Sequence, residues 1–181
     1  MNTQEPALGW PSVSESWIGI KGESGSNPNP DEDRPSSSRS LSEGQREKRA
    51  HILIVEDNPG DVFVIRAALQ KASVDAELSF VKDGEQAIKF FDEADADNGA
   101  PCPALVLLDI NLPRKQGGEV LQYMRGTRRC GQALVIAVSS SDTAMDREKM
   151  RGLGANCYFH KPSTYAEFLK LGELVKELLS R

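Results

Sequence analysis

Five short apolar runs, each followed by a segment of different periodicity, dominate the sequence from residue 51 onward. They are rich in Val, Ile and Leu, and comprise HILIV (51–55), ELSFV (77–81), ALVLL (104–108), ALVIAV (133–138) and NCYF (156–159). Runs of this length that are apolar on both faces are typical of strands buried in a parallel sheet. Their alternation with helical segments predicts an α/β fold, with a five-stranded parallel sheet and helices on both faces.

Helix signals lie between the apolar runs. Asn58 is a candidate N-cap with Pro59 at the first helical position, and a capping box at Thr164–Glu167 predicts the start of one last helix. Apolar stripes support the first and last helices, and shorter signals occur at 85–91, 118–125 and 142–151. The acidic cluster of residues 92–97 is interpreted as a solvated loop before the third strand.

Composition divides the 181 residues into two parts. Residues 1–48 contain ten Ser, five Pro and five Gly, so residues 1–49 are predicted to be a disordered extension, and residues 50–181 one domain. Both tryptophans, Trp10 and Trp17, lie in the extension, and the sequence gives them no assigned role.

Charge, hydropathy and cysteine content argue against several classes of protein and of binding site. A net charge of -5 argues against nucleic acid as a partner, and no apolar run approaches the roughly 18 residues of a membrane span. The N-terminus lacks the pattern of a secretory signal, so a cytoplasmic location is expected. Three cysteines without a CxxC favour reduced thiols over a disulfide or zinc site, with Cys157 buried and Cys102 and Cys130 in loops.

Polar residues follow four of the five apolar runs. Glu56 and Asp57 follow the first, Asp109 the third, Ser139 the fourth and Lys161 the fifth. The carboxyl ends of parallel strands meet at one edge of the sheet, so these side chains are expected to converge there. Carboxylates without a nearby His or Cys suit Mg²⁺, and an aspartate beside a metal and a cation suits phosphoryl transfer.

Four segments resemble the signatures of response-regulator receiver domains of two-component signalling. They are ILIVEDNPGD, LVLLDINLP, VIAVSSSD and GANCYFHKP, and the resemblance covers residues 51–181. It implies a flavodoxin-like sheet with strand order 2-1-3-4-5 and a cis peptide between Lys161 and Pro162. The segments EDNPGD and LLDINLPRKQGGEVL are similar to the corresponding segments of single-domain receivers found beside bacterial phytochromes.

The resemblance implies a metal site around a reactive aspartate. Asp109 would be the phosphoacceptor and a Mg²⁺ ligand, Asp57 a direct ligand and Glu56 a ligand through water. Asn111 would contribute its backbone carbonyl.

It also implies a switch. Lys161 and Ser139 would contact the phosphoryl group, and Tyr158 would turn inward together with Ser139. Asn111 and Ser141 would tune how quickly the acyl phosphate is lost.

The expected function is therefore that of a stand-alone response regulator. A sensor histidine kinase would phosphorylate Asp109, and the chain would be no enzyme beyond catalysing its own Mg²⁺-dependent phosphorylation and dephosphorylation. No output domain follows in the sequence, so output would pass through contact with an unidentified downstream protein or a homodimer, without nucleic acid or membrane.

Alternatives remain open. The chain could be a phosphate sink for another pathway, an aspartate-nucleophile phosphohydrolase or flavin protein on the same fold, or an unreactive scaffold. Phosphohydrolases of this kind usually carry DxD where this chain has Glu56-Asp57-Asn58, and the acidic EDNPGD loop would repel a flavin phosphate.

Overall fold

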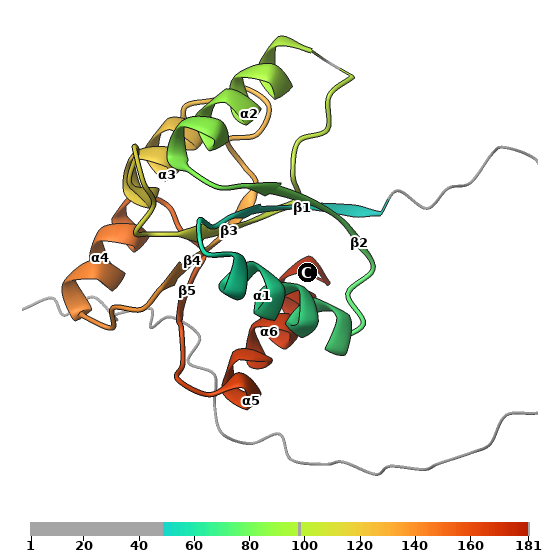
Figure 1. Cartoon of the computed structure of the whole chain (residues 1–181). Helices are drawn as coiled ribbons and strands as arrows, with labels where there is room; N and C mark the ends of the chain where they lie inside the picture. The colour runs from blue at the N-terminus through green and yellow to red at the C-terminus, as the bar shows by residue number, and fades with distance from the viewer. Residues whose placement is uncertain (1–48, 98, 181) are drawn as a thin grey trace, which may run out of the picture. The chain divides into compact units, whose positions relative to one another are not determined.

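Five parallel strands form one sheet in the computed structural model, which describes residues 49–97 and 99–180 (Figure 1). The strands are β1 (Ala50–Val55), β2 (Ala76–Val81), β3 (Leu105–Asp109), β4 (Leu134–Ser139) and β5 (Cys157–His160). Their spatial order is β2-β1-β3-β4-β5, and every neighbouring pair is parallel. The predicted fold class and strand order are confirmed.

Helices cover both faces of this sheet. They are α1 (Pro59–Lys71), α2 (Gly84–Ala96), α3 (Gly117–Arg125), α4 (Ala144–Gly152), α5 (Tyr165–Phe168) and α6 (Lys170–Leu179). Figure 1 shows α1, α5 and α6 on one side of the sheet and α2, α3 and α4 on the other. None of the helices among the described residues is long and apolar enough to cross a membrane.

The core lies on the central strands. β3 is buried along its whole length, and β1 and β4 are buried beyond their first residues. Helix α1 begins as predicted, because the Asn58 side chain accepts a hydrogen bond from the Gly60 amide at 2.9 Å, and Pro59 follows the cap. Close packing of α6 on α1 requires Gly172, since a Cβ there would come within 2.1 Å of the Ala68 carbonyl oxygen.

Several element boundaries differ from those predicted. β3, β4 and β5 extend one residue further, to Asp109, Ser139 and His160, because the parallel pairing continues through these polar residues. The last predicted helix is two helices, α5 and α6, on either side of Leu169. The acidic cluster belongs mostly to α2 rather than to a loop, since α2 runs to Ala96.

A disulfide joins Cys102 to Cys130, contrary to the expectation of reduced thiols. The two cysteines lie 28 residues apart in sequence, in the loops that precede the adjacent strands β3 and β4, which brings their Cα atoms to 5.3 Å. That separation suits a disulfide, and sequence spacing alone could not reveal it. Cys130 is buried, and Cys157, which is not part of this disulfide, is buried as expected.

No cis peptide bond occurs among the described residues, so the Lys161–Pro162 bond is trans, contrary to the expectation. Trans is the default for bonds preceding proline. The predicted disorder of residues 1–49, with Trp10 and Trp17, falls almost entirely outside the described residues and stays a prediction.

Candidate functional site

Three carboxylates meet at the carboxyl ends of β1 and β3. Glu56 and Asp57 directly follow β1, Asp109 ends the neighbouring β3, and each offers a ligand oxygen such that all three oxygens lie within 4.8 Å of one another. Glu56 and Asp109 are buried, whereas Asp57 is exposed. The convergence predicted from the strand ends is therefore present.

The ammonium group of Lys161 lies against these carboxylates. Its Nζ atom donates to Asp109 Oδ2 at 2.6 Å, Asp61 Oδ2 at 2.7 Å and Glu56 Oε2 at 2.8 Å. The Lys161 backbone amide donates to the Ser139 carbonyl at 2.7 Å, which ties the segment after β5 to the end of β4. The topology brings Lys161 within bonding distance of Asp109 across 52 residues of sequence.

These contacts and the burial of the pocket raise the pKa of both the base and one of the acids. Burial lowers the pKa of Lys161, but its hydrogen bonds to Asp109, Asp61 and Glu56 outweigh that effect, so the pKa is raised above its usual range. Burial raises the pKa of Glu56 to about 7, against the opposing effect of its hydrogen bond with Lys161, and the negative charge of Asp109 raises it further. The lysine is therefore charged, while Glu56 titrates near neutrality.

Asp61 is the pocket residue that the sequence did not single out. It lies in the first turn of α1, where an acidic residue has an ordinary explanation in the positive end of the helix dipole. Asp61 comes four positions after Asp57, but Asp57 precedes the helix, so this spacing is a weak signal on its own.

The backbone around Asp109 is tightly packed. Its second carboxylate oxygen, Oδ1, accepts a hydrogen bond from the Asn111 amide at 2.8 Å. Gly117, the first residue of α3, lies so close that a Cβ would come within 2.3 Å of the Asp109 carbonyl oxygen. Asn111 itself is exposed beside the pocket.

Ser139 and Tyr158 lie next to the pocket on β4 and β5. Ser139 is fully buried, and its Oγ accepts a hydrogen bond from the Ser141 amide at 3.0 Å. Tyr158 is also buried, its hydroxyl donates to the Ser141 carbonyl at 2.8 Å, and burial raises its pKa. Ser141 therefore connects the two predicted switch residues.

The donor set of the pocket fits a hard divalent cation. Three carboxylates with no His or Cys among the clustered ligands favour Mg²⁺ or Mn²⁺, which prefer oxygen. The neighbouring backbone carbonyl of Asn111 is of the same chemical type.

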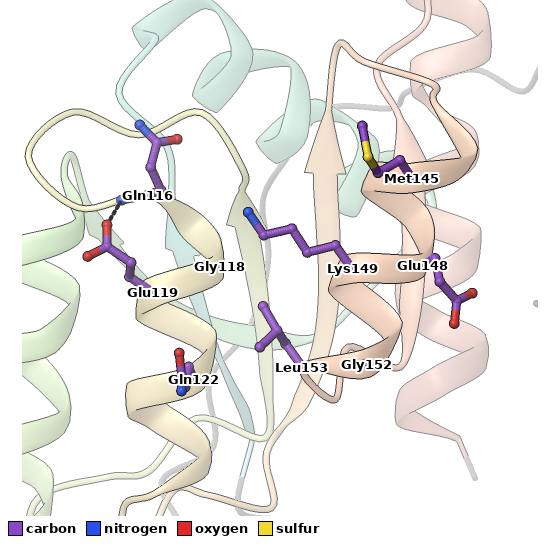
Figure 2. A pocket seen from close by; sticks show the side chains of 9 residues that line it. All are labelled: Gln116, Gly118, Glu119, Gln122, Met145, Glu148, Lys149, Gly152 and Leu153. Carbon is purple, nitrogen blue, oxygen red and sulfur yellow. Dashed lines mark hydrogen bonds between the residues drawn. The ribbon is translucent and has the colours of Figure 1, made fainter.

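A separate groove of about 750 Å³ lies between α3 and α4 (Figure 2). Figure 2 shows Glu119 and Gln122 on the α3 side of the groove and Lys149 and Leu153 on the α4 side, with the Glu119 carboxylate turned toward Gln116. None of the predicted site residues lines it, so it is not part of the acidic pocket.

Residues 52–172 match the family model of the response regulator receiver domain. The chain belongs to this family. Receiver domains are signalling modules that accept phosphoryl groups from histidine kinases and bind a divalent cation in an acidic pocket. In this chain Glu56, Asp57 and Asp109 form an acidic cluster.

Proteins similar to this chain include response regulators, one of them named as a phytochrome response regulator. The response regulator Rcp1 of Synechocystis is 31% identical over 120 residues, which cover 66% of this chain and 82% of Rcp1. The phosphorylated cyanobacterial phytochrome response regulator RcpA has a similar structure, with a TM-score of 0.64 and 30% identity over 71% of this chain and 92% of RcpA. The Mn²⁺-bound form of Rcp1 gives a TM-score of 0.63 and 29% identity, over 71% of this chain and 92% of Rcp1.

Proposed function

We propose that this receiver is a response regulator that takes a phosphoryl group from a sensor histidine kinase onto Asp109. The observation that carries the proposal is the position of the Asp109 carboxylate, 2.6 Å from the Lys161 ammonium and clustered with Glu56 and Asp57. An aspartate nucleophile needs positive charge to offset that of the incoming phosphoryl group, and this pocket offers both a cation and a metal-binding acid cluster.

The transfer is a displacement at phosphorus. A carboxylate oxygen of Asp109 forms a bond to the phosphorus of a phosphohistidine, the P–N bond breaks, and its electron pair returns to the imidazole nitrogen. Lys161 pairs with the phosphoryl oxygens. A divalent cation supplies further positive charge there when bound, with Asp57, Asp109 and the Asn111 carbonyl as ligands and Glu56 as a ligand through water.

The switch follows from the added charge. Phosphorylation adds about two negative charges beside Ser139, which draws the hydroxyl toward the phosphoryl group. Because Ser141 bonds to both Ser139 and Tyr158, a movement of Ser139 is transmitted to the Tyr158 ring. Ser141 and Asn111 border the approach of water to the acyl phosphate, and so set its lifetime.

The partners follow from the relatives. The names of RcpA and its neighbours link them to phytochromes, which supports a phytochrome-type sensor kinase as the phosphodonor. Output passes through phosphorylation-dependent protein contacts, including contacts between two copies, in the cytoplasm. The chain is a signalling protein whose chemistry is restricted to its own Asp109.

Intact-mass spectrometry after incubation with acetyl phosphate and Mg²⁺ tests the proposal. The wild type should gain a single phosphoryl group, and Asp109→Asn or a chelator should abolish the gain. Asp75→Asn is the matched control, because Asp75 lies outside the pocket and pairs with Arg49. No gain by the wild type with either acetyl phosphate or a phosphorylated kinase would contradict the proposal, as would turnover of a phosphomonoester.

A further inference from the structure

The Lys161 ammonium has three N–H donors, and each has a carboxylate partner. Two of the partners, Glu56 and Asp109, belong to the acid cluster suited to a divalent cation. The third, Asp61, lies at 2.7 Å from Nζ but outside that cluster. All three carboxylates pair with Lys161, but Asp61 alone among them is not part of the acid cluster.

This difference matters when a cation is bound. Glu56 and Asp109 must then share their negative charge with the cation, which weakens their attraction for the lysine. Asp61 keeps its full charge for Lys161. The contact is partly shielded from water, since the side chain of Lys161 is 13% exposed and that of Asp61 26% exposed.

We propose that Asp61 is a positioning residue that holds the Lys161 ammonium at the pocket while the cation and the phosphoryl group occupy the other carboxylates. The inference rests on the proposed phosphorylation of Asp109 and deepens it. Asp61 anchors the amine from α1, without belonging to the acid cluster, so that Lys161 meets the phosphoryl oxygens already oriented. The competing explanation is that Asp61 only stabilises the N-terminus of α1.

The first test needs neither metal nor phosphodonor. Lysines are acylated with an amine-reactive ester, and peptide mapping gives the rate at Lys161 relative to the exposed Lys71. Asp61→Asn keeps the side-chain shape but removes the charge, so the relative rate at Lys161 should rise by about threefold to tenfold. The matched control is Glu173→Gln, which removes an exposed acid from the first turn of α6 and should leave the rate unchanged.

The second test measures phosphorylation by acetyl phosphate and the affinity for Mg²⁺ in the same variants. Asp61→Asn should slow phosphorylation by about threefold to tenfold and change the Mg²⁺ affinity by less than about twofold. An unchanged Lys161 acylation rate would overturn the proposal, and so would a loss of Mg²⁺ affinity as large as the loss of rate. If the wild type itself is not phosphorylated, the proposed function fails, while the acylation rate still decides whether Asp61 holds Lys161.

Discussion

The guanidinium group of Arg147 lies over the aromatic ring of Tyr158, 5.0 Å from its centroid, and is paired with the carboxylate of Asp142. The first turn of α4 thereby contacts the buried ring of Tyr158, the proposed switch tyrosine. Arg147 lies on the surface of the ring, so it opposes any rotation of Tyr158 toward solvent.

Substituting Arg147 by Ala should loosen Tyr158. The chain contains three tyrosines, so ¹³C-labelled tyrosine gives a simple NMR spectrum. The Tyr158 ring signals should shift and broaden, whereas those of Tyr123 and Tyr165 should not. The melting temperature should fall by only about 1–4 °C, because a partly exposed cation–π contact contributes little. The control is Arg151→Ala, one turn further along α4, and an unchanged Tyr158 spectrum in Arg147→Ala would refute the prediction.

Reduction of the Cys102–Cys130 disulfide should destabilise the domain. The bond restricts the unfolded chain, and opening it should lower the melting temperature by roughly 5–15 °C. A Cys102→Ser, Cys130→Ser double variant should melt at the same temperature with and without reductant. Thiol titration of the denatured, unreduced protein should detect Cys157 alone, and three reactive thiols would show that the bond is absent.

Affinity for Mg²⁺ should depend on pH near neutrality. Burial raises the pKa of Glu56 to about 7, so below that pH a cation must displace a proton to gain the full charge of the cluster. Titration calorimetry should show affinity rising about tenfold between pH 6 and pH 8, with proton release in the acidic half. Glu56→Gln should flatten this dependence, and equal affinities of the wild type at both pH values would count against it.

The Glu56 carboxyl should also make the stability of the folded protein fall as pH rises, whereas the Mg²⁺ affinity rises with pH. In the metal-free protein its pKa of about 7 exceeds the ordinary value of 4.5, so the folded state binds the proton more tightly than the unfolded state. Its contribution to stability is therefore complete below about pH 4.5 and is lost as pH rises to about 7. Across this pH range, the melting temperature of the wild type should therefore fall relative to that of Glu56→Gln as pH rises.

Gly117→Ala should displace α3 from the pocket. The new Cβ would lie 2.3 Å from the Asp109 carbonyl oxygen and 2.8 Å from the Ile110 Cα, both of which are backbone atoms. We expect a loss of about 2–4 kcal/mol in the free energy of unfolding and slower phosphorylation. Gly152→Ala is the control, because nothing lies within 4 Å of its Cβ position, and it should be neutral or stabilising by less than about 1 kcal/mol. Equal denaturant midpoints for the two variants would contradict this reasoning.

The sequence predicted the sheet and most of the pocket, because buried parallel strands have continuous apolar runs and their carboxyl ends must meet. Asp109 and Lys161 could therefore be placed together before any distance was known. The predicted third and fourth strands stopped one residue short of Asp109 and Ser139, since a polar residue breaks an apolar run without breaking the pairing of the backbone.

What the sequence could not predict depends on contacts between distant segments. Asp61 has the appearance of an ordinary helix-start acid until α1 is packed beside the segment that carries Lys161. The acidic end of α2 had the appearance of a loop, but the Asp95 carboxylate accepts hydrogen bonds at 2.9 Å from the Arg128 and Arg129 amides, which hold the segment after α3 against it.

The disulfide also has a mechanical consequence. The segment between Cys102 and Cys130 is a closed covalent ring that contains β3, Asp109 and α3. Tension applied to the two ends of the domain passes through the sulfur–sulfur bond and leaves this ring slack. Under force, the oxidised protein would therefore extend about 90 Å less than the reduced protein, which corresponds to the 28-residue separation at full extension.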